Sequence, residues 1–330
     1  MPDPLVIRIM RQFKADLLAG ETAMQQEMAR RWLRVEARLS SQMDALALAM
    51  DAAKRDGATV SAEMLMNDVR YRQLLVQLTA ELETYTDYAE VQITAQQRRL
   101  GRLAVAHSSN AIEVQGIAGG FNRLPTEAVE YMVGNVNGQP LRGLLVASWP
   151  EAADGLTQAL VNGVALGYNP RKTAQEMAVG ATRSLNRMMV ISRTETLRVY
   201  REASRQNYIA SGVVSGYKRL CAHDSRVCPA CLMDEGHLYS LDEQMPEHPQ
   251  GRCTAVPVVE GVPQPRWLGG ADWFEQQDVP TQKSILGMGR YYAWQNGDID
   301  LRDLPRVVQN GVWGPSLQVV PLKELLGVLA

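Results

Sequence analysis

Cysteine and histidine side chains gather in one short stretch of this chain, at spacings that suit metal binding. All four cysteines lie between Cys221 and Cys253, with none in the 220 residues before and none in the 77 after. Cys228 and Cys231 form a C-x-x-C pair, and His248 and Cys253 follow after 16 intervening residues. Three thiolates and one imidazole are typical ligands of structural zinc and leave no open position for water. We therefore expect Cys228, Cys231, His248 and Cys253 to bind zinc and so stabilise a loop-rich segment.

Two other interpretations of the cysteines remain open. The C-x-x-C pair could be a redox pair, although its loop-rich surroundings do not suggest a thioredoxin-like unit. The thiols could also be reduced and simply buried. His223 and His237 are spare ligand candidates, and we expect each to be an ordinary surface or loop histidine.

The first 118 residues have the pattern of long helices. Apolar residues recur at steps of three and four from Met24 to Met50, which predicts a narrow seam on one helix. Gly20 is expected to end an earlier helix, and Asp56-Gly57 to end this one. A second seam follows, formed by Leu65, Val69, Leu75, Leu78, Leu82, Tyr85, Ala89, Ile93, Leu100 and Leu103. Two such helices can cover one another as an antiparallel hairpin, which would act as a docking arm or be an ordinary bundle core.

After residue 118 the sequence pattern predicts shorter helices and one long helix, followed by a region with short strands. Short helices are expected at about 126–135 and 151–166, and a long one from Pro170 to about Ser211. Short strands are expected at 213–220, 238–239 and 255–259, and the tail should consist of short helices. The predicted fold is mainly α, with a long N-terminal helical hairpin, central helices, a small α+β Cys/His module and a short-helix C-terminal tail. The expected domains are a helical arm (1–118), a linker with a short helix (119–150), a module (151–262) and a Trp-rich tail (263–330).

The net charge of −2 conceals two segments of opposite charge. Residues 171–226 hold 11 basic and four acidic side chains, whereas residues 227–330 hold seven and 13. A basic helix face can attract a polyanion without reading its sequence. It can equally be a solvated face that is partly paired with the acidic tail, which is the commoner case. The candidate contacts for DNA or an acidic protein are Arg183, Arg187, Arg198, Arg201 and Arg205.

Composition excludes two classes of protein. Hydrophobic residues make up 46% of the chain, enough to build packed cores, so a wholly disordered protein is excluded. No apolar run approaches the roughly 18 residues needed to cross a bilayer, so a membrane-spanning protein is excluded and we expect no membrane partner. The N-terminal residues lack a signal-peptide core, which favours a cytosolic origin.

Residues from about 150 to 260 resemble the phage Mu F-like head-morphogenesis family of minor head proteins. The resemblance depends on the ordered motifs Arg193-Thr194-Glu195, Gly216-Tyr217-Lys218, Asp224 to Cys231, His248-Pro249 and Arg252-Cys253. The tail is similar too, with Trp273-Phe274, Gln277, Gln282 and Ile285-Leu286-Gly287. The chain has Gly251 where the family commonly has a cysteine. If relatives use that cysteine as a ligand, this chain must either substitute His248 for it or lose the metal, and the cluster would then be a metal-free structural remnant.

The resemblance implies a structural, non-enzymatic protein of the virion, in the capsid interior or at the portal vertex, assembled in the host cytoplasm. The portal protein is the implied partner, with major capsid protein, scaffolding protein and non-specific phage DNA as further candidates. It also implies roles in head assembly and in DNA packaging or ejection. The family-motif residues Arg193, Thr194, Glu195, Asp224, Arg226 and Arg252 are expected to be structural anchors.

Within those motifs, we expect Arg193 to bond the loop around Asp224. The competing hypothesis is a metal-dependent nuclease or transferase built around His223, Asp224 and the cysteine cluster.

Overall fold

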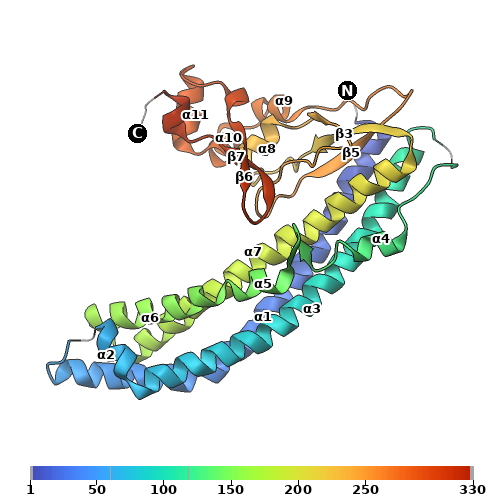
Figure 1. The fold of residues 1–330 in the computed structure, drawn as a ribbon. Coiled ribbons are helices and arrows are strands. Elements are labelled where there is room, and N and C mark those ends of the chain that lie inside the picture. Colours follow the sequence, from blue (N-terminus) through green and yellow to red (C-terminus); the bar gives the residue numbers. More distant parts are fainter. Residues whose placement is uncertain (1–2, 60, 118, 328–330) are drawn as a thin grey trace. The chain divides into compact units, whose positions relative to one another are not determined.

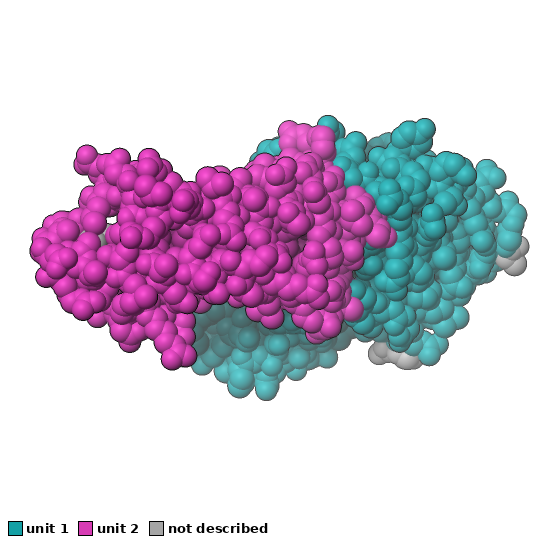
Figure 2. All heavy atoms as spheres, turned by 90° about the horizontal axis from the view of Figure 1, so that it is seen from below, with its two compact units in different colours: residues 1–20, 96–138, 194–330 teal, residues 21–95, 139–193 magenta. Residues whose placement is uncertain are grey.

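The computed structural model describes residues 3–59, 61–117 and 119–327. It divides the chain into two compact units, which Figure 2 shows in different colours. Unit 1 comprises residues 1–20, 96–138 and 194–330, and unit 2 comprises residues 21–95 and 139–193. Both units are discontinuous in sequence, because three long helices each contribute residues to both.

The described residues are mainly helical, as the sequence predicts (Figure 1). The helices are α1 (Leu5–Arg55), α2 (Ala62–Asn67), α3 (Val69–Glu113), α4 (Thr126–Glu130), α5 (Leu141–Val146), α6 (Trp149–Ala165), α7 (Pro170–Ser211), α8 (Pro229–Met233), α9 (Gly270–Glu275), α10 (Val279–Leu286), α11 (Met288–Gln295) and α12 (Leu322–Leu325), with a 3-10 turn at Leu301–Asp303. The strands are β1 (Asn135–Val136), β2 (Gln139–Pro140), β3 (Val214–Leu220), β4 (Leu238–Tyr239), β5 (Thr254–Val259), β6 (Pro305–Asn310) and β7 (Gly314–Val319). None of the described helices is long and apolar enough to cross a membrane.

Unit 2 contains the predicted antiparallel hairpin, formed by α1 from Glu21 to its end and by the first part of α3. Arg38 Nε donates to Glu81 Oε1 at 2.6 Å, and Tyr85 OH donates to the Met28 carbonyl at 2.9 Å. The α1 seam is buried as its spacing predicts, at Met28, Trp32, Val35, Leu39, Met43, Leu46 and Met50. The second seam is wrong at Val69, which is 57% exposed. Asp68 separates α2 from α3 and caps the new helix through Tyr71 N, so the phase of the buried face restarts there.

Gly20 does not end a helix, contrary to the sequence prediction. It lies inside α1, which runs unbroken from Leu5 to Arg55. A Cβ at this position would lie 2.8 Å from Arg99 Nη1, so the glycine permits a close side-chain approach. Asp56 and Gly57 do end the helix, with Gly57 in the left-handed region at φ 87°.

Unit 1 contains a three-stranded antiparallel sheet in the order β4-β3-β5. All three strands match the sequence prediction closely, and α7 begins at Pro170 as predicted. The tail differs from its prediction, because β6 and β7 form an antiparallel hairpin among the short helices. The Asn310 side chain accepts from Val312 N and Trp313 N and so closes the turn, a local signal that the helical prediction overlooked.

Candidate metal centre

The cysteines occupy the end of the β3–β5 ladder and the start of α8. The last paired residues of that ladder are Leu220 and Thr254, so Cys221 and Cys253 lie just beyond it, opposite one another. Cys228 is the N-cap residue of α8, and Pro229 is pre-set for the first helical turn. Cys231 follows within the same helix, which brings both thiols of the C-x-x-C motif to one side.

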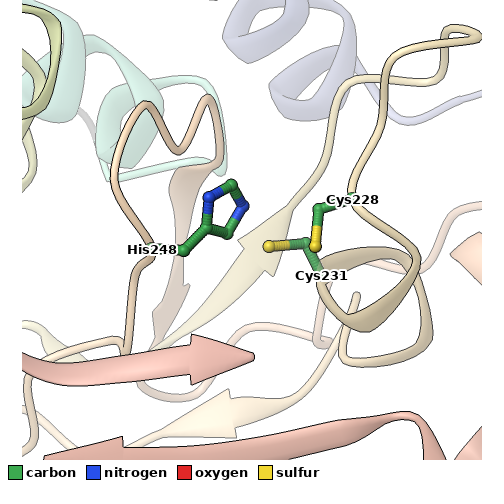
Figure 3. A group of neighbouring side chains, drawn as sticks. All are labelled: Cys228, Cys231 and His248. Carbon is green, nitrogen blue, oxygen red and sulfur yellow. The ribbon is translucent and has the colours of Figure 1, made fainter. Parts of the chain in front are cut away.

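Cys228, Cys231 and His248 form a close donor group, with all three ligand atoms within 4.8 Å of one another. Figure 3 shows the imidazole directed towards the two sulfur atoms. His248 Nδ1 lies 2.8 Å from the Pro249 carbonyl, which can only accept, so Nδ1 carries a proton and Nε2 is left for the sulfurs. A histidine that ligates a metal is commonly oriented by such a second hydrogen bond. These donors fit zinc, which prefers sulfur and nitrogen in a tetrahedral arrangement.

Cys228 and His248 shift each other's pKa in opposite directions. The hydrogen bond with Cys231 and the neighbouring His248 lower the pKa of Cys228 to about 4. Burial alone would lower the pKa of His248, but the hydrogen bond and charge of Cys228 raise it to about 9. The side chains therefore favour a thiolate at Cys228, the form that binds a metal.

Cys253, the fourth expected ligand, lies beyond this close group. Its Sγ is 3.5 Å from Cys221 Sγ, and hydrogen bonds with Cys221 and Cys231 lower its pKa. Cys221, which the expected ligand set leaves out, is therefore part of the same cluster. All four cysteines are free of disulfides.

A buried arginine joins the sulfur cluster to three acidic or polar groups. The Arg219 side chain is 0% exposed and donates to Asp234 Oδ2 at 2.7 Å and to Glu247 Oε1 at 2.9 Å. It also donates to the Pro246 carbonyl at 2.5 Å and contacts Cys231 Sγ at 3.7 Å. Sequence analysis missed Arg219, although a charged residue in an otherwise apolar strand was a visible signal.

Lys14 is a second buried cation beside the cysteines. It is 5% exposed, and its Nζ donates to the Leu220 carbonyl at 3.5 Å. Burial lowers the pKa of Lys14, while the thiols of Cys253 and Cys221 act to raise it. The sequence offers no signal for this contact, because Lys14 lies more than 200 residues away from the cysteines.

Thr194 links helix α7 to the loop that follows His248. Thr194 Oγ1 accepts from Gln250 N at 3.0 Å, which ties α7 to the segment between His248 and Cys253. Within unit 2, Arg193 donates to Glu21 and Gln25. Both oxygens of Asp224 are taken by Arg252, at 2.6 and 2.7 Å. The expected bond from Arg193 to the loop around Asp224 stays a prediction, and within unit 1 the carboxylate of Asp224 pairs with Arg252.

The other expected anchors have local roles. Glu195 is 0% exposed and accepts from Arg198 Nε at 2.7 Å, one turn along α7. Arg226 has an exposed side chain, and its backbone N–H donates to Asp224 Oδ1 at 2.9 Å. That bond closes the turn which leads into the C-x-x-C motif.

His223 and Asp224, the centre of the enzyme hypothesis, both have protein partners. His223 Nε2 lies 2.5 Å from Glu235 Oε2, and its ring stacks on Trp273. Asp224 is the partner of Arg252 described above. His237 is 55% exposed beside Asp234, as expected of a surface histidine.

The five arginines proposed as polyanion contacts fall into two groups. Arg198, Arg201 and Arg205 have side chains 23%, 11% and 14% exposed, and their partners in unit 1 include Glu195, the Gly251 carbonyl and Glu202. Arg183 and Arg187 lie in unit 2, where Arg183 is exposed and donates to Gln158. Most of the basic stripe on the last part of α7 is thus engaged inside unit 1.

Comparison with known proteins assigns a family to the region that carries the cluster. Residues 154–256 match the family model described as Phage Mu protein F like protein. No curated protein and no solved structure matches the chain. The matched residues include all of α7, β3 and β4, the first half of β5 and every candidate ligand described above. Residues 154–256 are therefore similar to the phage Mu protein F-like family, as their motifs predict, and this similarity supports a head-morphogenesis protein of a phage.

Proposed function

We propose that this protein is a minor head protein that acts at the portal vertex during assembly of a tailed-phage head. The family match over residues 154–256 is the observation that carries this proposal. The portal protein is the proposed direct partner. Major capsid protein, scaffolding protein and phage DNA are further proposed contacts, and the mature virion is the proposed location.

The role is proposed to be structural, without catalysis. In support, His223 and Asp224 are engaged by Glu235 and Arg252, and the donors around Cys228 are sulfur and imidazole, which favour a closed structural zinc site. Incubation with plasmid DNA and divalent metals tests this point directly. Cleavage that disappears in His223→Ala would contradict a purely structural role.

Copurification with the portal protein of the same phage tests the assembly role. Both proteins would be co-expressed, with a tag on the portal protein alone, and the complex isolated by size exclusion. We expect a stable complex that survives moderate salt. A control polypeptide with the same composition in scrambled order should not associate with the portal protein. Heads assembled without this protein should then be defective, and normal infectious heads would contradict the proposal.

We further propose that Cys228, Cys231, His248 and Cys253 hold one structural zinc ion. Bound metal would hold α8 against the segment that leads into β5, so its binding energy would add to folding energy. Elemental analysis of untagged protein should give about one zinc per chain. Metal-free protein with all four thiols reactive in the native state would rule out this site.

A further inference from the structure

Cys221 lies beside Cys253, one of the four proposed zinc ligands. Its Sγ is 3.5 Å from Cys253 Sγ, close to the roughly 3.8 Å that separates two thiolates on one tetrahedral zinc with Zn–S bonds of about 2.3 Å. The pairing of Leu220 with Thr254 at the end of the β3–β5 ladder fixes this approach. The two thiols are thus held together by the sheet, and not by chance rotamers of a loop.

The cysteine is also turned into the cluster and away from solvent. Cys221 is 2% exposed, and its Sγ lies 2.9 Å from the carbonyl of Cys231, another expected ligand. Gly251 has no side chain that could compete as a ligand. A Cβ at this position would overlap the Glu247 carboxylate. The thiols in or against this cluster are those of Cys221, Cys228, Cys231 and Cys253.

The surroundings of Cys221 can balance an additional negative charge. Arg219 contacts Cys231 Sγ, and Lys14 binds the carbonyl of Leu220, the residue just before Cys221. Both cations are buried, so their attraction for a thiolate is poorly screened by solvent. A site with four thiolates carries one more negative charge than a site with three, and the contacts with Cys231 and Leu220 bring both cations close to that charge.

We propose that Cys221 is a fifth donor of the metal centre, which replaces His248 as the fourth ligand when the imidazole is lost. Five donors then serve four coordination positions, and the ion is retained in a site made only of sulfur. The inference rests on the proposed zinc function and adds a ligand to it.

Four forms of the full-length chain test this inference: wild type, His248→Ala, Cys221→Ser and the double variant. Zinc affinity would be measured by competition with a chelator, and Co²⁺ would report the thiolate number through its sulfur-to-metal charge-transfer absorbance. We expect His248→Ala to keep one metal ion and to show stronger charge-transfer absorbance per cobalt than wild type. The double variant should bind zinc at least about tenfold more weakly than His248→Ala, since even outer-sphere changes cost that much.

The matched control combines Cys221→Ser with His237→Ala, which removes an exposed histidine near the same sheet and should leave affinity close to that of Cys221→Ser. Equal affinities of His248→Ala and the double variant would overturn the role of Cys221 while leaving the zinc site in place. Absence of metal from wild type would overturn both proposals. If the double variant does not fold, the cobalt spectrum of His248→Ala decides alone, and unchanged or weaker charge-transfer absorbance overturns the inference.

Discussion

Arg219 is the side chain on which the polar interior of unit 1 depends most. Its guanidinium is fully buried and is shared by Asp234, Glu247 and the Pro246 carbonyl. Removing one member of a buried ion pair leaves the others uncompensated and typically costs about 3–5 kcal/mol. Arg219→Met should therefore lower the free energy of unfolding by about that amount, as measured by urea titration with tryptophan fluorescence.

The control for that substitution is Arg306→Met. Arg306 pairs with Glu324 at a position where both side chains are about half exposed, and such a pair contributes about 1 kcal/mol or less. Similar losses in the two variants would show that the buried network around Arg219 adds no special stability.

The ion pair of Asp224, in the loop before the C-x-x-C motif, should make the stability of the protein depend on pH. Its hydrogen bonds with Arg252 hold its pKa below the usual value of 3.8. A carboxylate whose folded pKa is lowered stabilises the protein above its unfolded pKa, and this contribution is lost as pH falls through the folded pKa. Asp224→Asn should thus be less stable at pH 7 and lose less stability than wild type between about pH 5 and pH 2.

Urea titrations at several pH values measure this difference, with Asp44→Asn on the exposed face of α1 as control. Parallel pH profiles for wild type and Asp224→Asn would mean that the pair with Arg252 adds nothing to folding.

At the scale of elements, two glycines set how closely α6 and α7 approach within unit 2. A Cβ on Gly155 would overlap the Gly180 carbonyl oxygen, and a Cβ on Gly180 would overlap that of Gly155. Alanine gains up to about 1 kcal/mol of helix propensity over glycine. Overpacking typically costs about 1–3 kcal/mol, and here the obstacle is backbone, which cannot turn aside.

Gly180→Ala should therefore destabilise the protein by about 1–3 kcal/mol, as measured by thermal unfolding monitored at a helical circular-dichroism band. Gly143→Ala is the matched control, because Gly143 is an exposed residue of α5 with nothing within 4 Å of an added Cβ. That change should be neutral or stabilising. A stabilised Gly180→Ala variant would show that the two helices can separate without loss.

The sequence predicted elements far better than it predicted contacts between them. Apolar spacing located the α1 seam, and Pro170 marked the start of α7, because both signals are local. The close donor group of Cys228, Cys231 and His248 was likewise visible as a spacing of residue types. Partners such as Lys14 for the cysteines, or Arg252 for Asp224, depend on which distant segments the fold brings together, and one sequence does not encode that as a local pattern.

At the scale of the whole molecule, the expected domains are continuous segments, whereas each compact unit is assembled from distant ones. The family-matched region shares its cores with residues far outside it. Val6, Ile7 and Met10 of α1 pack with Leu220 and Val256. Ile112 of α3 packs with Tyr217 and Tyr239 in a second cluster, and Phe274 and Leu286 join the cysteines in a third.

A fragment of residues 151–262 should consequently fail to fold alone. Burying Val6, Ile7, Met10 and Ile112 is worth about 1.5–3 kcal/mol each, so their loss alone removes about 6–12 kcal/mol from a total that is typically 5–15. We expect the isolated fragment to show poor amide dispersion in its NMR spectrum and no near-ultraviolet circular dichroism. Co-expression of 1–120 with 121–330, which supplies every core residue across one break in the chain, should restore both signals. A well-dispersed spectrum from 151–262 alone would show that the matched region is an autonomous domain, and that the N-terminal helices contribute to its stability without being needed for its fold.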